Sequence, residues 1–172
     1  NLGAYLSTFA PAVPTYMHAV LLAGVYTTPM IYCNVIGVYT HTVPVDAYRG
    51  AGRPEAIYMI ERLIDTAARE MNLDRVELRR RNLITTAEMP YANPLGMTYD
   101  SGDYAVCIAM AMARADWDGI GDRRAEAEAR GRLLGTGFAV YVESSIGTPL
   151  EQARITVTDQ DRIDVGIGTQ PS

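Results

Sequence analysis

Residues 44–84 read PVDAYRGAGRPEAIYMIERLIDTAAREMNLDRVELRRRNLI and carry the strongest local folding signals in the chain. Pro54 stands where a helix can begin, because the first helical residue needs no N–H donor. From there to Met71, apolar residues recur at intervals of three or four positions, and charged residues occupy the other face. This stretch therefore predicts an amphipathic helix over residues 54–71.

A second, shorter helix is predicted directly after the first. Asp74 can cap its N-terminus, and Glu77 three residues later completes a capping-box pattern. Arg79, Arg80 and Arg81 fall near its C-terminal end, where positive charge complements the helix dipole. A contact with nucleic acid is the alternative for these arginines, but the acidic chain favours a solvated helix end.

The loop before the first helix combines glycines with arginines. No charged residue occurs in residues 1–45, whereas Arg49 and Arg53 lie beside Gly50 and Gly52. The glycines allow a positive φ or a close approach of the backbone to a ligand. The arginines are suited to oxyanions, and the helix directs the positive end of its dipole at the loop. These features indicate a cradle for an anion or a cofactor.

An ordinary entry into a helix is the alternative for this loop, with the arginines pairing Asp46 or Glu55. The two commonest phosphate motifs do not fit. A phosphate loop needs a lysine, and the chain contains none. A dinucleotide fingerprint needs a third glycine where Glu55 stands. The residues alone leave the cradle and the structural loop both open.

Composition limits the class of protein. The chain has 172 residues, of which 48% are hydrophobic and 20% charged, as in a soluble globular domain. Its formal net charge is −5, which argues against a nucleic-acid partner because such proteins usually present a basic face. The sequence starts without Met and stops just after an apparent strand, so we expect a piece of a longer polypeptide.

The cysteines and histidines do not predict a metal site. Cys33 and Cys107 have no second Cys and no His at the spacing of metal ligands. We expect them to be free, buried thiols in a reducing compartment, which points to the cytoplasm. His18 and His41 also lack partners at ligand spacing and are predicted to be core or loop residues.

The N-terminal third of the chain is apolar. Residues 12–40 carry no charge over a length that could cross a bilayer, but Gly24 and Pro29 interrupt them. We therefore expect no membrane segment. A buried helix near residues 13–23 and a buried, β-branched strand near residues 30–40 fit better.

The remainder of the chain predicts helices followed by strands. An Ala- and Met-rich helix is expected at about 102–115, and a charged surface helix ends at Gly131. Period-two alternation predicts strands at 135–144, 152–158 and 162–168. This order of elements is typical of an α+β fold.

The sequence resembles a known family over nearly its whole length. The motifs AYRGAGRPEA, ELRRRNLI, MPYANPLGMTYDSGDY and LLGTGFAVYVES are similar to the large subunit of the molybdenum hydroxylases. That family includes xanthine dehydrogenase, aldehyde oxidoreductases and aerobic carbon monoxide dehydrogenase. The resemblance implies that residues 1–172 form part of the molybdopterin-binding region, with helices at roughly 54–131 and a strand-rich part at 135–172.

The resemblance also implies roles for individual residues. Tyr48, Arg49, Gly50 and Gly52 would face a molybdenum-pterin cofactor, which is held by its pterin and not by protein ligands to the metal. Further residues would line the substrate pocket, namely Ala51, Gly147 and Thr148. No catalytic residue is expected in this chain, because the glutamate that acts as general base in the family lies beyond Ser172.

The implied reaction is hydroxylation with water as the oxygen source. The small Ala51 removes the aromatic that stacks a purine in xanthine-type relatives, and YRGAGR lacks the cysteine that binds copper in true carbon monoxide dehydrogenases. The resemblance therefore favours the copper-free branch and an aldehyde or N-heterocycle as substrate. Carbon monoxide is the alternative substrate, and a non-catalytic anion-binding or scaffold module is the alternative function.

The resemblance further implies partners. We expect molybdopterin cytosine dinucleotide as the form of the cofactor, iron–sulfur and FAD subunits, a dimer of heterotrimers and a small-molecule substrate. Neither nucleic acid nor a membrane is expected as a partner.

Overall fold

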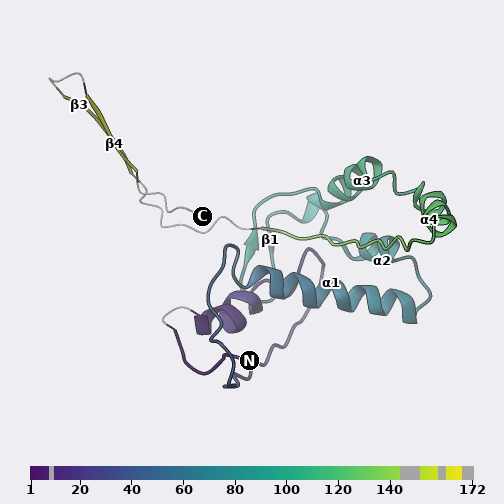
Figure 1. Cartoon of the computed structure of the whole chain (residues 1–172), viewed down its shortest axis with the longest axis horizontal. Helices are drawn as coiled ribbons and strands as arrows, with labels where there is room; N and C mark the ends of the chain where they lie inside the picture. The colour runs from purple at the N-terminus through teal and green to yellow at the C-terminus, as the bar shows by residue number, and fades with distance from the viewer. Residues whose placement is uncertain (8–9, 144–151, 159–161, 168–172) are drawn as a thin grey trace. The chain divides into compact units, whose positions relative to one another are not determined.

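The computed structural model describes residues 1–7, 10–143, 152–158 and 162–167, and the chain divides into two compact units. The first unit, Asn1–Val142, contains helices and a short hairpin, and the second unit, Glu143–Ser172, contains one β-hairpin (Figure 1). The elements in chain order are η1 (Ala10–Ala12), η2 (Val13–Met17), α1 (Arg53–Glu70), α2 (Arg75–Asn82), η3 (Thr86–Glu88), β1 (Tyr91–Ala92), β2 (Thr98–Tyr99), α3 (Tyr104–Arg114), α4 (Ile120–Ala129), β3 (Ala153–Val157) and β4 (Ile163–Ile167). The mixture of helices and strands confirms the predicted α+β class.

The first two long helices begin and end close to their predicted limits. Pro54 lies in the first turn of α1, and the Asp74 carboxylate accepts hydrogen bonds from the amides of Val76 and Glu77, both at 2.9 Å. Glu77 does not complete a capping box, because its carboxylate accepts a 2.8 Å hydrogen bond from Arg81 one turn later. Local signals of this kind need no distant partner, so the sequence alone could predict both helices.

Removing the cap of α2 should destabilise the first unit. We expect Asp74→Ala to lower the free energy of unfolding by about 1 kcal/mol, because two amides at the helix start lose their acceptor. Urea denaturation of parent and variant measures the difference. Asp118→Ala, at an exposed position, serves as control and should leave stability within about 0.5 kcal/mol. Equal midpoints for all three proteins would show that the cap contributes nothing.

The predicted helix in the N-terminal third is confirmed over residues 13–19, whereas the predicted strand is wrong. η2 is π-helical and continues as α-helix through His18 and Ala19, and residues 20–23 form turns instead of further helix. Residues 30–40 form no strand, and Met30 and Tyr32 are 83% and 88% exposed. A strand needs a neighbour, and the only ladder contact of this segment with another described residue is a single bridge between Gly3 and Tyr39.

Two of the three later strands are confirmed. β3 and β4 pair antiparallel, with Ile155 opposite Val165, and their described side chains are all exposed. The strand expected at 135–144 does not form, because residues 135–143 run extended without a strand partner among the described residues. The helix expected at about 102–115 is α3, and the charged helix is α4, which is followed by Gly131 at φ +69°.

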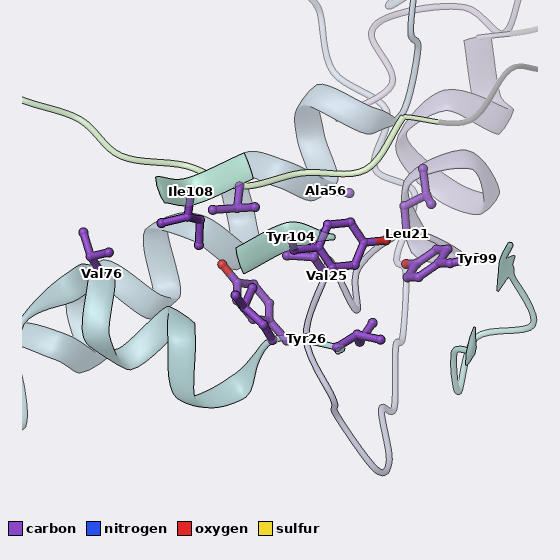
Figure 2. Close-up of a cluster of buried hydrophobic side chains, with 11 residues drawn as sticks. Leu21, Val25, Tyr26, Ala56, Val76, Tyr99, Tyr104 and Ile108 are labelled. Carbon is purple, nitrogen blue, oxygen red and sulfur yellow. The ribbon is translucent and has the colours of Figure 1, made fainter. Parts of the chain in front are cut away.

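The core of the first unit lies between α1, α2, α3 and the turns that follow η2. Figure 2 shows three tyrosine rings, Tyr26, Tyr99 and Tyr104, packed among aliphatic side chains from these elements. The Tyr99 hydroxyl donates a 2.8 Å hydrogen bond to the carbonyl of Gly24 and accepts one of 3.1 Å from Asn93. The buried polar atoms of this aromatic cluster therefore help to fix the turn at Gly24 against the hairpin of β1 and β2.

The cysteines differ from the expectation of burial. Cys33 is only partly buried, Cys107 on α3 is exposed, and both are free thiols. Within the described part of the chain, no helix is both long and apolar enough to span a bilayer. Three or more His, Cys, Asp or Glu side chains do not converge on a metal position anywhere in the described residues.

Candidate functional site

The loop between Tyr48 and Arg53 is built from two consecutive tight turns. The amide of Ala51 donates to the carbonyl of Tyr48 at 2.8 Å, and the amide of Arg53 donates to that of Gly50 at 2.9 Å. Gly50 has φ +76° and Gly52 has φ +89°, a region that other L-residues adopt only with strain. The prediction from the sequence that glycines stand here because they allow a positive φ is confirmed.

Gly52 also lies against the N-terminal segment. A Cβ at this position would lie 2.5 Å from Cβ of Met17 and 2.8 Å from the backbone N of His18. The close approach that the sequence indicated is therefore an approach to the protein's own backbone. It docks the loop, and with it the start of α1, on the turns that follow η2.

The two arginines of the loop face different environments. Arg49 is exposed, next to Tyr48, which is 88% exposed, whereas Arg53 is only 6% exposed. Of the two loop arginines, Arg49 is therefore the one that is open to solvent, and the expectation that both serve an anion stays a prediction. Arg49 forms no ion pair with Asp46 or any other described residue, and the Asp46 carboxylate instead accepts a 2.7 Å hydrogen bond from the amide of Ala47.

The N-terminus of α1 opens onto the same loop. Gly52 is the N-cap residue, and no side chain caps the first turn of this 18-residue helix. The Arg53 amide already donates to Gly50, and Pro54 has no N–H, so the helix dipole and not a row of free amides supplies the positive potential at this helix start. Together with the exposed guanidinium of Arg49, this potential suits a negatively charged group.

His18 adds a buried polar atom next to this loop. The sequence predicted a core or a loop position for this histidine, and the residue is 7% exposed, so its side chain belongs to the core. Its Nδ1 atom has no hydrogen-bond partner among the described residues. The exposed Arg49 guanidinium and the positive end of the α1 dipole have the charge that a phosphate-bearing cofactor requires.

Of the remaining predicted site residues, the structure describes those in the loop but not those in the second segment. Gly50 and Ala51 are half-buried in the loop, where Ala51 offers a small side chain beside the exposed Tyr48. Gly147 and Thr148 lie outside the described residues. The structure therefore assembles Tyr48, Arg49, Gly50, Ala51 and Gly52 in one loop and does not test the second substrate segment.

A buried ionic cluster behind the loop was missed by sequence reasoning. Arg79 is 0% exposed, although the run of three arginines predicted a solvated helix end. Its Nε donates to the Glu61 carboxylate at 2.8 Å, and its Nη1 donates to Asp65 at 2.9 Å. The Tyr26 hydroxyl donates to the other Glu61 oxygen at 2.5 Å. We call these four side chains the Glu61–Arg79 hub.

Titration in the hub follows from its burial. Burial raises the pKa of the Tyr26 hydroxyl well above its ordinary value, and the adjacent Glu61 carboxylate raises it further. Burial by itself lowers the pKa of Arg79, but Glu61 and Asp65 more than offset this and the pKa is raised. The hub therefore holds a neutral phenol and a charged guanidinium. In the sequence, the feature that could have indicated the hub is Glu61, a carboxylate that directly follows Ile60 on the inner face of α1.

The hub also binds the chain beyond α4. The amide of Val140 donates to Glu61 at 3.1 Å, and Arg79 donates to the carbonyl of Phe138 at 3.2 Å while lying 5.5 Å from the centre of its ring. α1 thus carries the loop at its N-terminus and holds residues 138–140 near its middle. One helix therefore positions two segments that are far apart in the sequence.

Comparisons with known proteins agree with this geometry. A family described as the molybdopterin cofactor-binding domain matches residues 1–83, which include the loop and all of α1 and α2. The carbon monoxide dehydrogenase large chain of Hydrogenophaga pseudoflava is 37% identical over 72% of this chain and 16% of its own length. The 6-hydroxypseudooxynicotine dehydrogenase complex subunit gamma of Paenarthrobacter nicotinovorans is 30% identical over 98% of this chain and 22% of its own length.

A solved structure extends the likeness to the fold. Quinoline 2-oxidoreductase from Pseudomonas putida 86 matches with a TM-score of 0.79 and 31% identity, over 96% of this chain and 23% of that chain. The chain thus spans less than a quarter of the length of these relatives. With the glycine–arginine loop, the uncapped helix start and the matched domain in the same segment, the chain belongs to the molybdenum hydroxylase family and carries part of its molybdopterin-binding region.

Proposed function

We propose that the loop Tyr48–Gly52 holds part of a molybdenum-pterin cofactor in a molybdenum-dependent oxidoreductase. The observation that carries this proposal is the exposed Arg49 guanidinium, unpaired among the described residues, beside a helix N-terminus that no side chain caps. Both lie within the segment that matches the molybdopterin cofactor-binding domain. A structural loop would be expected to pair that arginine with Asp46 or Glu55 instead.

The residues of the loop take distinct parts in binding. Arg49 would donate charge-assisted hydrogen bonds to anionic groups of the cofactor, and the amides around Gly50 would add neutral donors. Tyr48 offers an exposed ring and hydroxyl at the same edge, and Gly52 fixes the loop on the N-terminal segment. When bound, the cofactor supplies the redox chemistry, and the protein supplies binding and orientation.

The substrate is proposed to be an aldehyde or an N-heterocycle, hydroxylated with water as the source of oxygen. Ala51 would border the substrate, and its half-buried methyl group leaves space and offers no ring for stacking a purine. Gly147 and Thr148 would line another part of the pocket. The loop sequence YRGAGR contains no cysteine, which supports the copper-free branch over carbon monoxide oxidation. The general base would lie outside this chain.

The complete enzyme is proposed to work with other subunits. Relatives are named as a large chain and as a subunit gamma of a complex, which supports iron–sulfur and FAD partners that carry electrons away. We further propose molybdopterin cytosine dinucleotide as the form of the cofactor, a dimer of heterotrimers and a cytoplasmic location.

Replacing Arg49 tests the proposal directly. We expect Arg49→Ala in the full-length subunit to weaken cofactor retention by about 10- to 100-fold, the loss expected when charge-assisted hydrogen bonds worth about 1.5–3 kcal/mol are removed. Molybdenum content by mass spectrometry and pterin content by fluorescence after oxidative release measure the change. Arg62→Ala, which removes an exposed arginine from α1, should keep the parent content.

Two outcomes would contradict the proposal. Full molybdenum and pterin content in Arg49→Ala would remove the role given to the loop. A parent protein without molybdenum at any stoichiometry would favour the alternative of a non-catalytic anion-binding or scaffold module.

A further inference from the structure

Residues 134–142 form an extended segment that we call the edge segment. Its even-numbered residues are inward, and Phe138, Val140 and Val142 pack on the core cluster, whereas the odd-numbered residues from 135 to 141 are exposed. This alternation is that of a β-strand with one buried face. No strand pairs with it among the described residues, which raises the question of how its backbone polar groups are satisfied.

Side chains of α1 and α2 satisfy one edge of the segment. Three even-numbered residues take part in these hydrogen bonds. Arg75 Nη1 donates to the carbonyl of Thr136 at 3.2 Å, and Arg79 Nη2 donates to the carbonyl of Phe138 at 3.2 Å. The amide of Val140 donates to the Glu61 carboxylate at 3.1 Å. In an extended chain, the N–H and C=O of one residue point to one side, and those of the next residue point to the other. Charged side chains therefore occupy the even edge at Thr136, Phe138 and Val140.

The odd edge is open. The backbone groups of Gly135, Gly137, Ala139 and Tyr141 form no hydrogen bond with any described residue. Their side chains are small up to Ala139, and nothing lies within 4 Å of the Cβ positions of Gly135 and Gly137. An open edge with small residues is a template on which another strand can add, because backbone hydrogen bonding supplies the attraction and glycine permits close approach.

An apolar groove runs beside this segment. It has a volume of about 370 Å³ and is lined by residues 137–141 together with α3 and the turn after it. The lining residues from this helix and turn include Cys107, Ile108, Ala111, Met112 and Trp117. In Figure 1 the segment crosses the first unit next to these elements, between α4 and the hairpin of β1 and β2. A strand added to the odd edge would place alternate side chains in this groove, and they would need to be apolar.

We propose that an extended segment from the same polypeptide, outside residues 1–172, pairs with the odd edge and fills the groove. The backbone donors and acceptors of Gly137 and Ala139 specify an extended occupant, and the lining specifies apolar residues at alternate positions. The same polypeptide is the source because the relatives carry more than three quarters of their length outside the matched region. This inference does not depend on the cofactor or on the reaction proposed above.

Site-specific photo-crosslinking in the full-length subunit tests the proposal. p-Benzoylphenylalanine replaces Tyr141, which lines the groove and is 58% exposed, and a second variant carries it at Tyr58, which is 70% exposed on α1. The expected result is an intramolecular crosslink from position 141 to a peptide outside residues 1–172 whose sequence alternates apolar and polar residues. Position 58 should not crosslink to that peptide.

Hydrogen exchange supplies an independent measurement on the unmodified protein. The amides of Gly137 and Ala139 should exchange on the order of 100-fold more slowly than the amide of Leu133, which is 95% exposed. A crosslink from position 141 to another protein, to a second copy, to residues 144–172 or to nothing would overturn the proposal. Unprotected amides at both positions would overturn it as well.

Discussion

Glu61→Leu should lower the free energy of unfolding by about 3–5 kcal/mol, because it removes the carboxylate that pairs with the buried guanidinium of Arg79. The leucine matches the space but accepts no hydrogen bond. The Tyr26 hydroxyl and the Val140 amide lose their acceptor in the same step. Asp65, at 2.9 Å from Arg79, remains as a second carboxylate and limits the loss.

Denaturant unfolding of parent and variant, followed by circular dichroism, measures this effect. The matched control is Glu70→Leu, at an exposed position on the same helix, and should change stability by less than about 0.5 kcal/mol. The double variant Glu61→Leu with Arg79→Met should recover much of the loss, since a buried ion pair can often be replaced by apolar residues at little cost. A single variant as stable as the parent would show that Arg79 is not held by Glu61.

Gly52→Ala should be the second severe substitution. The added Cβ meets Met17 at 2.5 Å and forces a non-glycine residue to φ +89°. Backbone strain of about 1–3 kcal/mol and steric displacement of about 1–3 kcal/mol together predict a loss of about 2–6 kcal/mol. Because the loop would be displaced from Met17, cofactor retention should also fall.

Gly121→Ala is the matched control for this substitution. Gly121 lies in α4, and nothing approaches its Cβ position within 4 Å, so alanine should stabilise the helix by about 0.5–1 kcal/mol. Thermal unfolding and molybdenum content are measured for both variants. If Gly52→Ala and Gly121→Ala unfold at the same temperature, the docking of the loop on Met17 and His18 is not as the structure has it.

The contrast between helices and strands explains how far the sequence could predict this fold. α1 and α2 follow from Pro54, Asp74 and a regular apolar period, all of which act within one element. Residues 30–40 and 135–143 have the composition of strands, but a strand also requires a partner that no local pattern supplies. The β3–β4 hairpin could be predicted because its partner follows within a few residues.

The candidate site shows the same limit. The glycines and Arg49 were recognisable because their residue types suit an anion at a helix start. The burial of Arg53 and Arg79 was not, since the sequence gives the same signal for a solvated and for a buried arginine. What distinguishes Arg79 is the position of Glu61 and Asp65 on a neighbouring helix, which is a property of packing.

The separation between the loop and the hub bears on how the protein can be engineered. Ala51 lies in a loop that is anchored by Gly52, and none of the hub contacts involves it. Under the proposal that Ala51 borders the substrate, libraries that vary side-chain volume at this position can therefore explore new specificities without loss of the scaffold. Changes at Glu61 and Arg79 must instead be made in pairs, so directed evolution by single steps will leave these two positions fixed.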